Sequence, residues 1–305
     1  YGKAPEMAKH ILEGYAEGIR ELRQTGCRAA ASTAVLRRAE ATESLEPLLR
    51  TTWNQTTPYN NLCPEAADGG LDGYGGRCPA GCVPVAIAQI MNYWQWPKHG
   101  YGKHTNTQIK VSQTVNFTQS VYDWDNMLDN YGGEYTEAQA QAVAKLMADI
   151  GCAMNTEYKN AESSTYVQNT RHYLFRYFDY SPDVTTEWWS DAGISGVSYS
   201  DWLKAELRAK RPVLCTGYVK GDKSHEVVCD GFQYYEDGLD RGTGRRFNFF
   251  HMNFGWGGNT DGYYADFDDE VDFYTLNHWV ADYIGFRPNT LPRVLKDNNY
   301  YLIRD

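Results

Sequence analysis

Cys82 occupies the position in this sequence that is best suited to nucleophilic chemistry. It opens the stretch CVPVAIAQIMNYW, in which apolar residues recur at helical spacing. Pro84 fits a helix only in its first turn, so the helix is predicted to start within a residue or two of Cys82. The N–H groups and the positive dipole end of a helix N-terminus stabilise a thiolate, the nucleophilic form of cysteine. The alternative is a small buried residue at a helix start, and a partner base is needed to decide.

His225 is the candidate general base. It is predicted to stand at the start of a strand, between the turn GYVKGDKS and the segment EVVCDGF. An imidazole on a sheet that faces a thiol on a helix can hold the thiolate as an ion pair. His251, inside FNFFHMNFGW, is expected to be structural. The remaining histidines lack a companion motif and are expected on the surface or in packing: His10, His99, His104, His172 and His278.

The other cysteines predict neither a disulfide framework nor a metal site. The seven cysteines are widely scattered and odd in number. Cys78 and Cys82 have a spacing that zinc ligands use, but no second Cys/His pair accompanies them, so no metal is predicted. Three cysteines lie in apolar runs and are expected to be buried: Cys152, Cys215 and Cys229.

Helices are predicted in the first two thirds of the chain and strands in the last third. The helix after Cys82 is expected to bury one face, and further helices are predicted over 137–150 with Gly151 as terminator, over 166–178, and over 201–210 with Ser200 as cap. A polar stretch over 105–117 favours strands. From Arg211 onward, five strand-like segments alternate with Gly/Asp turns: RPVLCTGYV, HEVVCDGFQYY, RRFNFFHMNFGW, GYYADF and NHWVADYIGF. This order predicts an α+β architecture in two halves.

Length and charge exclude several classes of function. A chain of 305 residues forms one large domain or two ordinary ones. Its net charge of -10 argues against a nucleic-acid partner and against an anionic membrane surface. No run of eighteen apolar residues is present, so no membrane span is predicted.

The N-terminal segment reads as a basic appendage. Residues 5–24 predict an amphipathic helix, and residues 29–42 are small and polar, with Arg37 and Arg38 in a linker that a protease could cut. Residues 1–38 contain seven basic and four acidic side chains, whereas the chain as a whole is acidic. This charge difference favours docking of the segment on the body.

Four motifs resemble, in order and spacing, the streptopain family of secreted bacterial cysteine peptidases. They are WNQTTPYN, AGCVPVAIAQIMNYW, SHEVVCDG and FFHMNFGWGGNTDGYY, and the match runs from about Leu45 to Pro288. The resemblance implies an α+β, papain-like cysteine peptidase fold, with a helical half, an antiparallel β half and the active-site cleft between them. It also implies a secreted virulence factor.

The resemblance assigns roles to individual residues. Cys82 would be the nucleophile and His225 the base, while Gln55 would join the backbone N–H of Cys82 as an oxyanion-hole donor. Asn253 would lie beside the histidine as the fourth catalytic residue. Phe254 stands where the family has a tryptophan of an Asn-Trp-Gly-Trp motif, so the indole N–H is lost at that position.

Substrate-binding positions also follow from the resemblance. The family's glycine before the histidine is Ser224 here, and its small residue after the histidine is Glu226. Ala161 stands where a serine is expected in a loop that contacts substrate. The complete predicted substrate-binding set is Ala161, Ser224, Glu226, Phe254 and Trp256.

The sequence therefore predicts a secreted cysteine endopeptidase in a zymogen-like form. Residues 1–43 would be the end of a pro-segment, and residues 44–305 the catalytic domain. Its partners would be protein or peptide substrates, with the pro-segment as intramolecular inhibitor, and no cofactor is predicted. One alternative is a papain-fold acyltransferase or amidase that uses the same pair. The other is a binding or adhesin module without turnover.

Overall fold

The computed structural model describes residues 41–108, 112–183, 199–219, 223–236, 246–266, 278–283, 287–289, 293–296 and 299–302. The predicted N-terminal helix over 5–24 lies outside the described residues, as does nearly all of the linker over 29–42.

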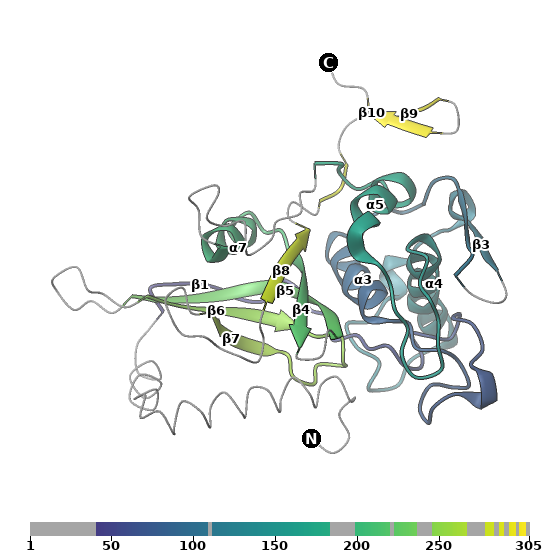
Figure 1. Ribbon diagram of the computed structural model, residues 1–305, viewed down its shortest axis with the longest axis horizontal. Helices are drawn as coiled ribbons and strands as arrows, with labels where there is room; N and C mark the ends of the chain where they lie inside the picture. The colour runs from purple at the N-terminus through teal and green to yellow at the C-terminus, as the bar shows by residue number, and fades with distance from the viewer. Residues whose placement is uncertain are drawn as a thin grey trace. The chain divides into compact units, whose positions relative to one another are not determined.

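The chain divides into two compact units, and both are drawn in Figure 1. The helical unit comprises Leu49–Thr186, Gly255–Gly258 and Tyr283–Asp305, and the sheet unit comprises Tyr1–Leu48, Glu187–Phe254 and Asn259–Asp282. The two predicted halves are therefore present, each with its own elements.

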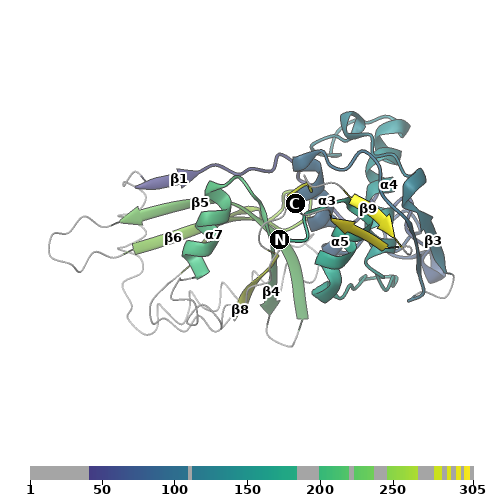
Figure 2. The same ribbon diagram turned by 90° about the horizontal axis from the view of Figure 1, so that it is seen from above.

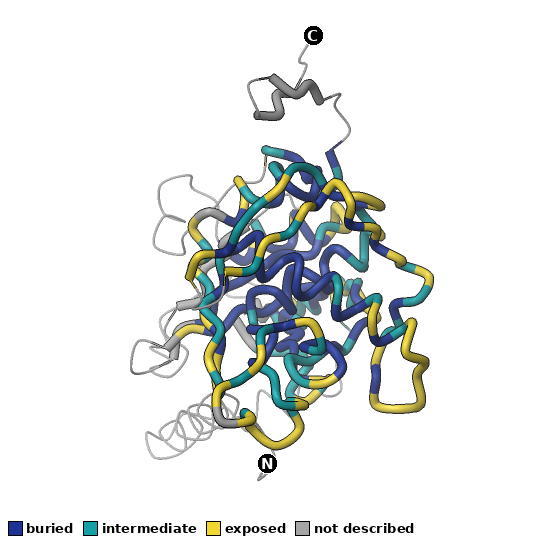
Figure 3. The backbone as a smooth tube through the Cα atoms, turned by 90° about the vertical axis from the view of Figure 1, so that its right-hand side faces the viewer, coloured by how far each residue is buried: buried dark blue, intermediate teal, exposed yellow. Residues whose placement is uncertain are grey.

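The central helix of the helical unit is α3, Cys82–Trp94. It starts at Cys82, as Pro84 predicted, but it does not bury only one face. Every residue from Val83 to Met91 is buried, because other segments of the unit surround the helix. Figure 3 shows such buried stretches in dark blue beneath exposed loops in yellow. A helix that is packed on all sides has little freedom to move, so the position of Cys82 at its start is fixed.

Helix α4, Glu137–Ala153, packs beside α3 (Figure 1). Thr136 and Gln139 form a capping box at its start. The prediction that Gly151 ends this helix is wrong, because the helix continues for two more residues. A Cβ at Gly151 would lie 1.9 Å from the hydroxyl of Tyr158, so the glycine permits that close approach. The left-handed residue after the helix is Asn155, with φ 54°.

The rest of the helical unit contains short helices and hairpins. Residues 166–178 form a 3-10 turn, Val167–Asn169, followed by α5, Thr170–Phe178, so the predicted helix starts later than expected. Strands β2 and β3 pair antiparallel, and β2 begins two residues before the stretch 105–117 in which strands were predicted. The bounds of the remaining elements are β2 Lys103–Asn106, β3 Gln113–Asn116, β9 Arg293–Lys296, β10 Asn299–Leu302, and 3-10 turns at Ala67–Gly69, Phe117–Gln119 and Trp124–Asn126.

The sheet unit is built on the long strand β5, Lys223–Glu236. The strand order is β7-β6-β5-β4-β8, and β1 pairs with the second half of β5. The pairs β4/β5, β5/β6, β6/β7 and β1/β5 are antiparallel. All five predicted strands are present, with bounds β4 Val213–Val219, β6 Arg246–Asn253, β7 Gly262–Asp266 and β8 His278–Tyr283, and β1 covers Glu43–Leu45.

Helix α7, Tyr199–Arg208, covers one face of this sheet (Figure 2). The Arg208 guanidinium lies over the Phe232 ring and also pairs with Glu43 of β1. The prediction that Ser200 caps the helix is wrong, since Ser200 is its second residue and is buried. In the described part of the chain, no helix has the length and apolar character needed to cross a bilayer.

Candidate active site

Cys82 is the first residue of α3, and its thiol is partly exposed. Gly81 precedes it with φ 95°, a conformation that favours glycine. The N–H of Val85 donates to the carbonyl of Gly81, and this bond begins the helical ladder. The helix contains no acidic residue in its first turn, so no side chain there opposes the positive end of its dipole. The thiol thus lies at the position that stabilises a thiolate.

The backbone of Gln55 lies beside the segment that leads into Cys82. The N–H of Ala80 donates to the Gln55 carbonyl at 2.9 Å. The Gln55 N–H donates to Oδ1 of Asn54 at 2.7 Å, so the backbone of Gln55 is held on both sides. Within the helical unit, therefore, the predicted oxyanion donor and the predicted nucleophile are brought near each other.

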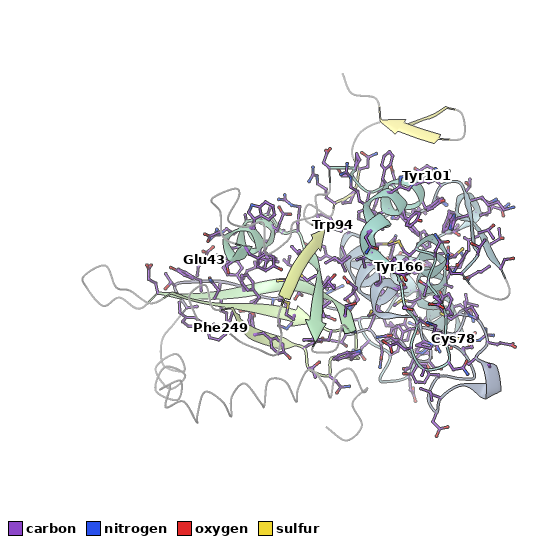
Figure 4. All side chains as sticks on the ribbon, viewed as in Figure 1. Glu43, Cys78, Trp94, Tyr101, Tyr166 and Phe249 are labelled. Carbon is purple, nitrogen blue, oxygen red and sulfur yellow. The ribbon has the colours of Figure 1, made fainter. Side chains whose placement is uncertain are left out.

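The loop that contains Ala161 also reaches the start of α3. Ala161 itself is exposed, but Ser163 is buried and its Oγ donates to the Pro79 carbonyl at 2.7 Å. A Cβ on Gly81 would lie 3.5 Å from the Cβ of Ser163. Tyr166, labelled in Figure 4, follows this loop with 80% of its surface exposed.

The glycine-rich turn Gly255–Gly258 packs in the helical unit as well. A Cβ on Gly255 would lie 2.8 Å from Cγ1 of Val85, so only glycine permits this contact with the first turn of α3. The N–H of Gly257 donates to the Trp53 carbonyl at 2.9 Å. Trp256, a predicted substrate-binding residue, lies between Gly255 and Gly257 in the sequence, and it is buried.

Gln89 is a residue of this region that sequence reasoning missed. Its Oε1 accepts from the hydroxyl of Thr51 and from the N–H of Trp53, at 3.0 and 3.2 Å. It therefore fixes the segment before Gln55 against α3. A lone amide within the apolar run VAIAQIM was the available signal, because a buried polar side chain needs a specific partner.

The other described cysteines differ from Cys82 in being buried. Burial raises the pKa of Cys63 to about 12 and that of Cys152 to about 11, and it raises the pKa of Cys229 well above its usual range. These thiols stay protonated and unreactive near neutral pH. Cys78 is buried too, and among the described residues no group of three His, Cys, Asp or Glu side chains suits a metal ion.

His225 lies in the sheet unit as the third residue of β5, paired with Gly217 of β4. The strand begins at Lys223, so it starts two residues before His225, which was predicted to stand at the strand start. Its side chain is 4% exposed, and burial lowers its pKa from 6.5 to about 4. The imidazole is therefore neutral near pH 7.

The contact between His225 and Phe254 determines which ring nitrogen can act as a base. Nε2 of His225 lies 2.8 Å from the Phe254 carbonyl oxygen. A carbonyl can only accept, so Nε2 carries the proton, and in the neutral ring Nδ1 is the basic atom. The phenyl ring of Phe254 is nearly parallel to the imidazole, at 10° and 6.3 Å between centroids. Phe254 thus orients the imidazole through its carbonyl and shields it with its ring.

The other predicted residues of the sheet unit lie on β5 and β6. Asn253 is buried at the end of β6 and pairs with Val228. Glu226 is buried and accepts from the Thr216 hydroxyl at 2.5 Å, whereas Ser224 is exposed. Glu226 therefore packs within the sheet.

Nδ1 of His251 lies 2.6 Å from Oδ1 of Asp230, a contact that suits the structural role predicted for this histidine. Asp230 is fully buried at a β-bulge of β5. Asp261, which sequence reasoning did not single out, accepts from the Phe254 N–H at 2.9 Å.

The buried neutral imidazole of His225 should make the stability of the fold depend on pH. The unfolded chain binds more protons than the folded chain between about pH 6.5 and pH 4, so the free energy of unfolding falls as the pH falls through this window. That difference in pKa corresponds to about 3 kcal/mol. In urea denaturation, His225→Gln should lose correspondingly less stability over this window than the parent. The exposed His99→Gln variant should follow the parent, and identical curves for all three proteins would contradict the burial of a neutral His225.

Comparisons with known proteins place these observations in a family. Residues 53–264 match the Peptidase C10 family. Streptopain from Streptococcus pyogenes is 29% identical over an alignment of 273 residues that covers 85% of this chain and 64% of streptopain. The chain thus spans less than two thirds of the length of that relative. The thiol protease/hemagglutinin PrtT from Porphyromonas gingivalis is 27% identical over 261 residues, covering 83% of this chain and 27% of PrtT.

Solved structures agree with the fold. A prointerpain A fragment from Prevotella intermedia has a TM-score of 0.64 at 28% identity, covering 90% of this chain and 81% of the fragment. The active interpain A cysteine protease from the same organism has a TM-score of 0.60 at 31% identity, covering 80% of this chain and 94% of that chain. The predicted α+β, papain-like cysteine peptidase fold is confirmed. With the family match extending over most of its length, this chain belongs to the peptidase C10 family, the family of streptopain.

Proposed function

We propose that this chain is a secreted cysteine endopeptidase in which Cys82 is the nucleophile and His225 the base. The observation that carries the proposal is the difference in burial between Cys82 and the other described thiols, in a chain that belongs to a peptidase family. Of the six described thiols, Cys82 alone is not buried, and it stands at the N-terminus of a rigid helix. The proposal of secretion rests on the resemblance of the four motifs to secreted peptidases.

The connection between Phe254 and Gly255 along the chain supports the proposal that Cys82 and His225 act together. Phe254 and Gly255 are consecutive residues that belong to different units. The Phe254 carbonyl accepts from His225, and Gly255 packs against Val85 in the first turn after Cys82. One peptide bond therefore links the residue that orients the base to the residue that packs on the nucleophile's helix.

The reaction would proceed through an acyl-enzyme. Nδ1 of His225 takes the proton of the Cys82 thiol as the sulfur attacks the peptide carbonyl, and the carbonyl oxygen becomes an oxyanion. The Gln55 side chain and the Cys82 N–H would donate to that oxyanion. The C–N bond then breaks, and His225 gives its proton to the leaving amine. Water, deprotonated by His225, hydrolyses the thioester and restores the free thiol.

Two alternatives predict different products. An acyltransferase or amidase would use the same pair, but it would pass the acyl group to another acceptor or cleave side-chain amides without shortening a protein substrate. A binding or adhesin module would leave Cys82 inert. Casein digestion analysed by mass spectrometry separates the three, because only the endopeptidase produces new internal peptide ends.

We also propose that residues 1–43 keep the enzyme latent by restraining His225. The basic composition of residues 1–38 suits the acidic remainder of the chain. The proposed boundary falls inside β1, because Glu43 pairs with Tyr234 and with Arg208, and the Thr42 N–H donates to the Tyr234 carbonyl. A cut that leaves the sheet intact therefore lies before Thr42.

Cutting the chain between Arg28 and Ala41 should raise caseinolytic activity. The Cys82→Ala chain, which cannot cut itself, should stay intact during the same incubation. The separate peptide 1–38 should inhibit the cut enzyme, less strongly at high salt if charge contributes to docking. Full activity of an uncut chain with Arg37 and Arg38 replaced by glutamine, verified as intact by mass spectrometry, would contradict latency.

A further inference from the structure

We propose that Asp261 is a positioning residue for the His225 imidazole and acts through the backbone of Phe254. This inference rests on the proposed role of His225 as the base. The Phe254 N–H donates to Oδ1 of Asp261 at 2.9 Å, and the Phe254 carbonyl accepts from Nε2 of His225 at 2.8 Å. One residue thus connects the carboxylate to the imidazole through two hydrogen bonds.

Phe254 needs such an anchor because it is the last residue before a glycine-rich turn. Gly255, Gly257, Gly258 and Thr260 all have positive φ. Glycine leaves a backbone more conformational freedom than other residues, so the sequence of this turn does not by itself fix the Phe254 carbonyl. Asp261 lies at the C-terminal end of the same turn, and its carboxylate accepts the hydrogen bond from the Phe254 N–H. This bond joins the two ends of the turn at Phe254, the residue whose carbonyl orients the base.

The surroundings favour a carboxylate that is held in place. Burial raises the pKa of Asp261 to about 6, and the hydrogen bond from Phe254 opposes that rise. His251 on β6 lowers the pKa, while Asp230 at the bulge of β5 raises it, and burial and Asp261 in turn raise the pKa of the Tyr264 hydroxyl on β7. Near neutral pH the group is ionised, and an ionised acceptor forms a stronger hydrogen bond with the Phe254 N–H than a neutral one.

The side chain of Phe254 is also fixed. Its ring stacks on the imidazole and meets the Tyr264 ring edge-on at 5.4 Å. The ring contacts hold the side chain, whereas the Asp261 bond holds the peptide group. Loss of the Asp261 acceptor should therefore release the carbonyl while leaving the packing of Phe254 largely intact.

The test compares three variants of the full chain in a Cys82→Ala background, which prevents self-cleavage. Asp261→Ala removes the acceptor, and Asp261→Asn keeps a neutral acceptor of the same shape. Tyr264→Phe is the matched control, because it removes a hydrogen bond from Tyr264 to the Thr260 carbonyl in the same turn. If Asp261→Ala does not fold, Asp261→Ser serves instead, since its shorter side chain keeps the turn polar.

The first readout is the 15N spectrum of His225, which reports the tautomer and the solvent exchange of the Nε2 proton. The parent, Asp261→Asn and Tyr264→Phe should show the Nε2–H tautomer with slow exchange. Asp261→Ala should show a mixture of tautomers and at least about 10-fold faster exchange of the proton. A tautomer and an exchange rate in Asp261→Ala equal to those of the parent would overturn the proposal. If Asp261 only stabilised the fold, its replacement would leave the His225 tautomer and the exchange rate of the Nε2 proton unchanged.

The second readout is casein hydrolysis by the same variants with Cys82 restored and the linker cut. Asp261→Ala should lower kcat about 10- to 100-fold with KM within about twofold of the parent, because misplacement of a catalytic group affects the chemical step. Asp261→Asn should recover most of kcat. An inactive parent with the expected His225 signature would refute the proposed function while supporting the role of Asp261. An active parent with an unchanged signature in Asp261→Ala would refute the role of Asp261 alone.

Discussion

Replacing Cys82 with alanine should lower kcat for casein by about a million-fold, because removal of the nucleophile in a protease of this mechanistic type removes the acyl-enzyme route altogether. The side chain is small and partly exposed at the first residue of α3, so its loss should leave the fold intact. Initial rates with fluorescent casein, together with a thermal unfolding curve for each protein, measure both effects.

The matched controls are Cys152→Ala and Cys229→Ala. Both thiols are fully buried, and their raised pKa values keep them protonated. Their removal should cost stability but leave hydrolysis measurable at a temperature where the variants are folded. Hydrolysis by Cys82→Ala at the parent rate would overturn the peptidase mechanism.

Replacing Gln55 with alanine should lower kcat by about 100- to 1000-fold, the usual effect of losing one oxyanion-hole donor. The backbone of Gln55 is held by Ala80 and Asn54 independently of the side chain, so truncation should not displace the loop. KM should change little, since the donor acts on the oxyanion that forms in the transition state.

Thr57→Ala is the matched control, because Thr57 is an exposed residue of the same loop. Its kcat should remain within about twofold of the parent, as expected for a surface substitution. A rise in KM with unchanged kcat in Gln55→Ala would instead assign Gln55 to substrate binding.

Much of the fold could be predicted because the decisive signals are local. Pro84 can stand only in the first turn of a helix, and α3 does start at Cys82. The alternation of apolar residues with Gly/Asp turns after Arg211 gave the five strands β4 to β8. Such patterns reflect backbone sterics and burial on one face, which a sequence displays directly.

The errors arose where a contact distant in the sequence decided the outcome. Gly151 suggested a helix end, but the hydroxyl of Tyr158 occupies the space where a Cβ would stand. The helix after Cys82 was expected to bury one face, but it is buried on all sides, and Gln89 is satisfied by residues more than thirty positions away. A local sequence pattern cannot predict contacts with residues that are so distant in the sequence.

The same distinction applies to the candidate site. Cys82, His225 and Gln55 could be named from motifs, because their residue types carry the chemistry. The neutral state of His225, by contrast, depends on its burial, and its tautomer depends on a carbonyl 29 positions away in the sequence. Asp261 was hidden in the turn motif NTDGYY, since aspartate is common in turns for local reasons.

The most direct test of Cys82 as the nucleophile and His225 as the base is to locate a thiol-reactive label on the protein. The cut chain is treated with an epoxide thiol reagent near neutral pH, residual casein hydrolysis is followed over time, and the labelled peptide is identified by mass spectrometry. We expect Cys82 to be labelled in proportion to the loss of activity, and His225→Ala, verified as folded, to be labelled much more slowly. Loss of activity with the label on another cysteine, or equal labelling of Cys82 with and without His225, would contradict the proposed nucleophile and base.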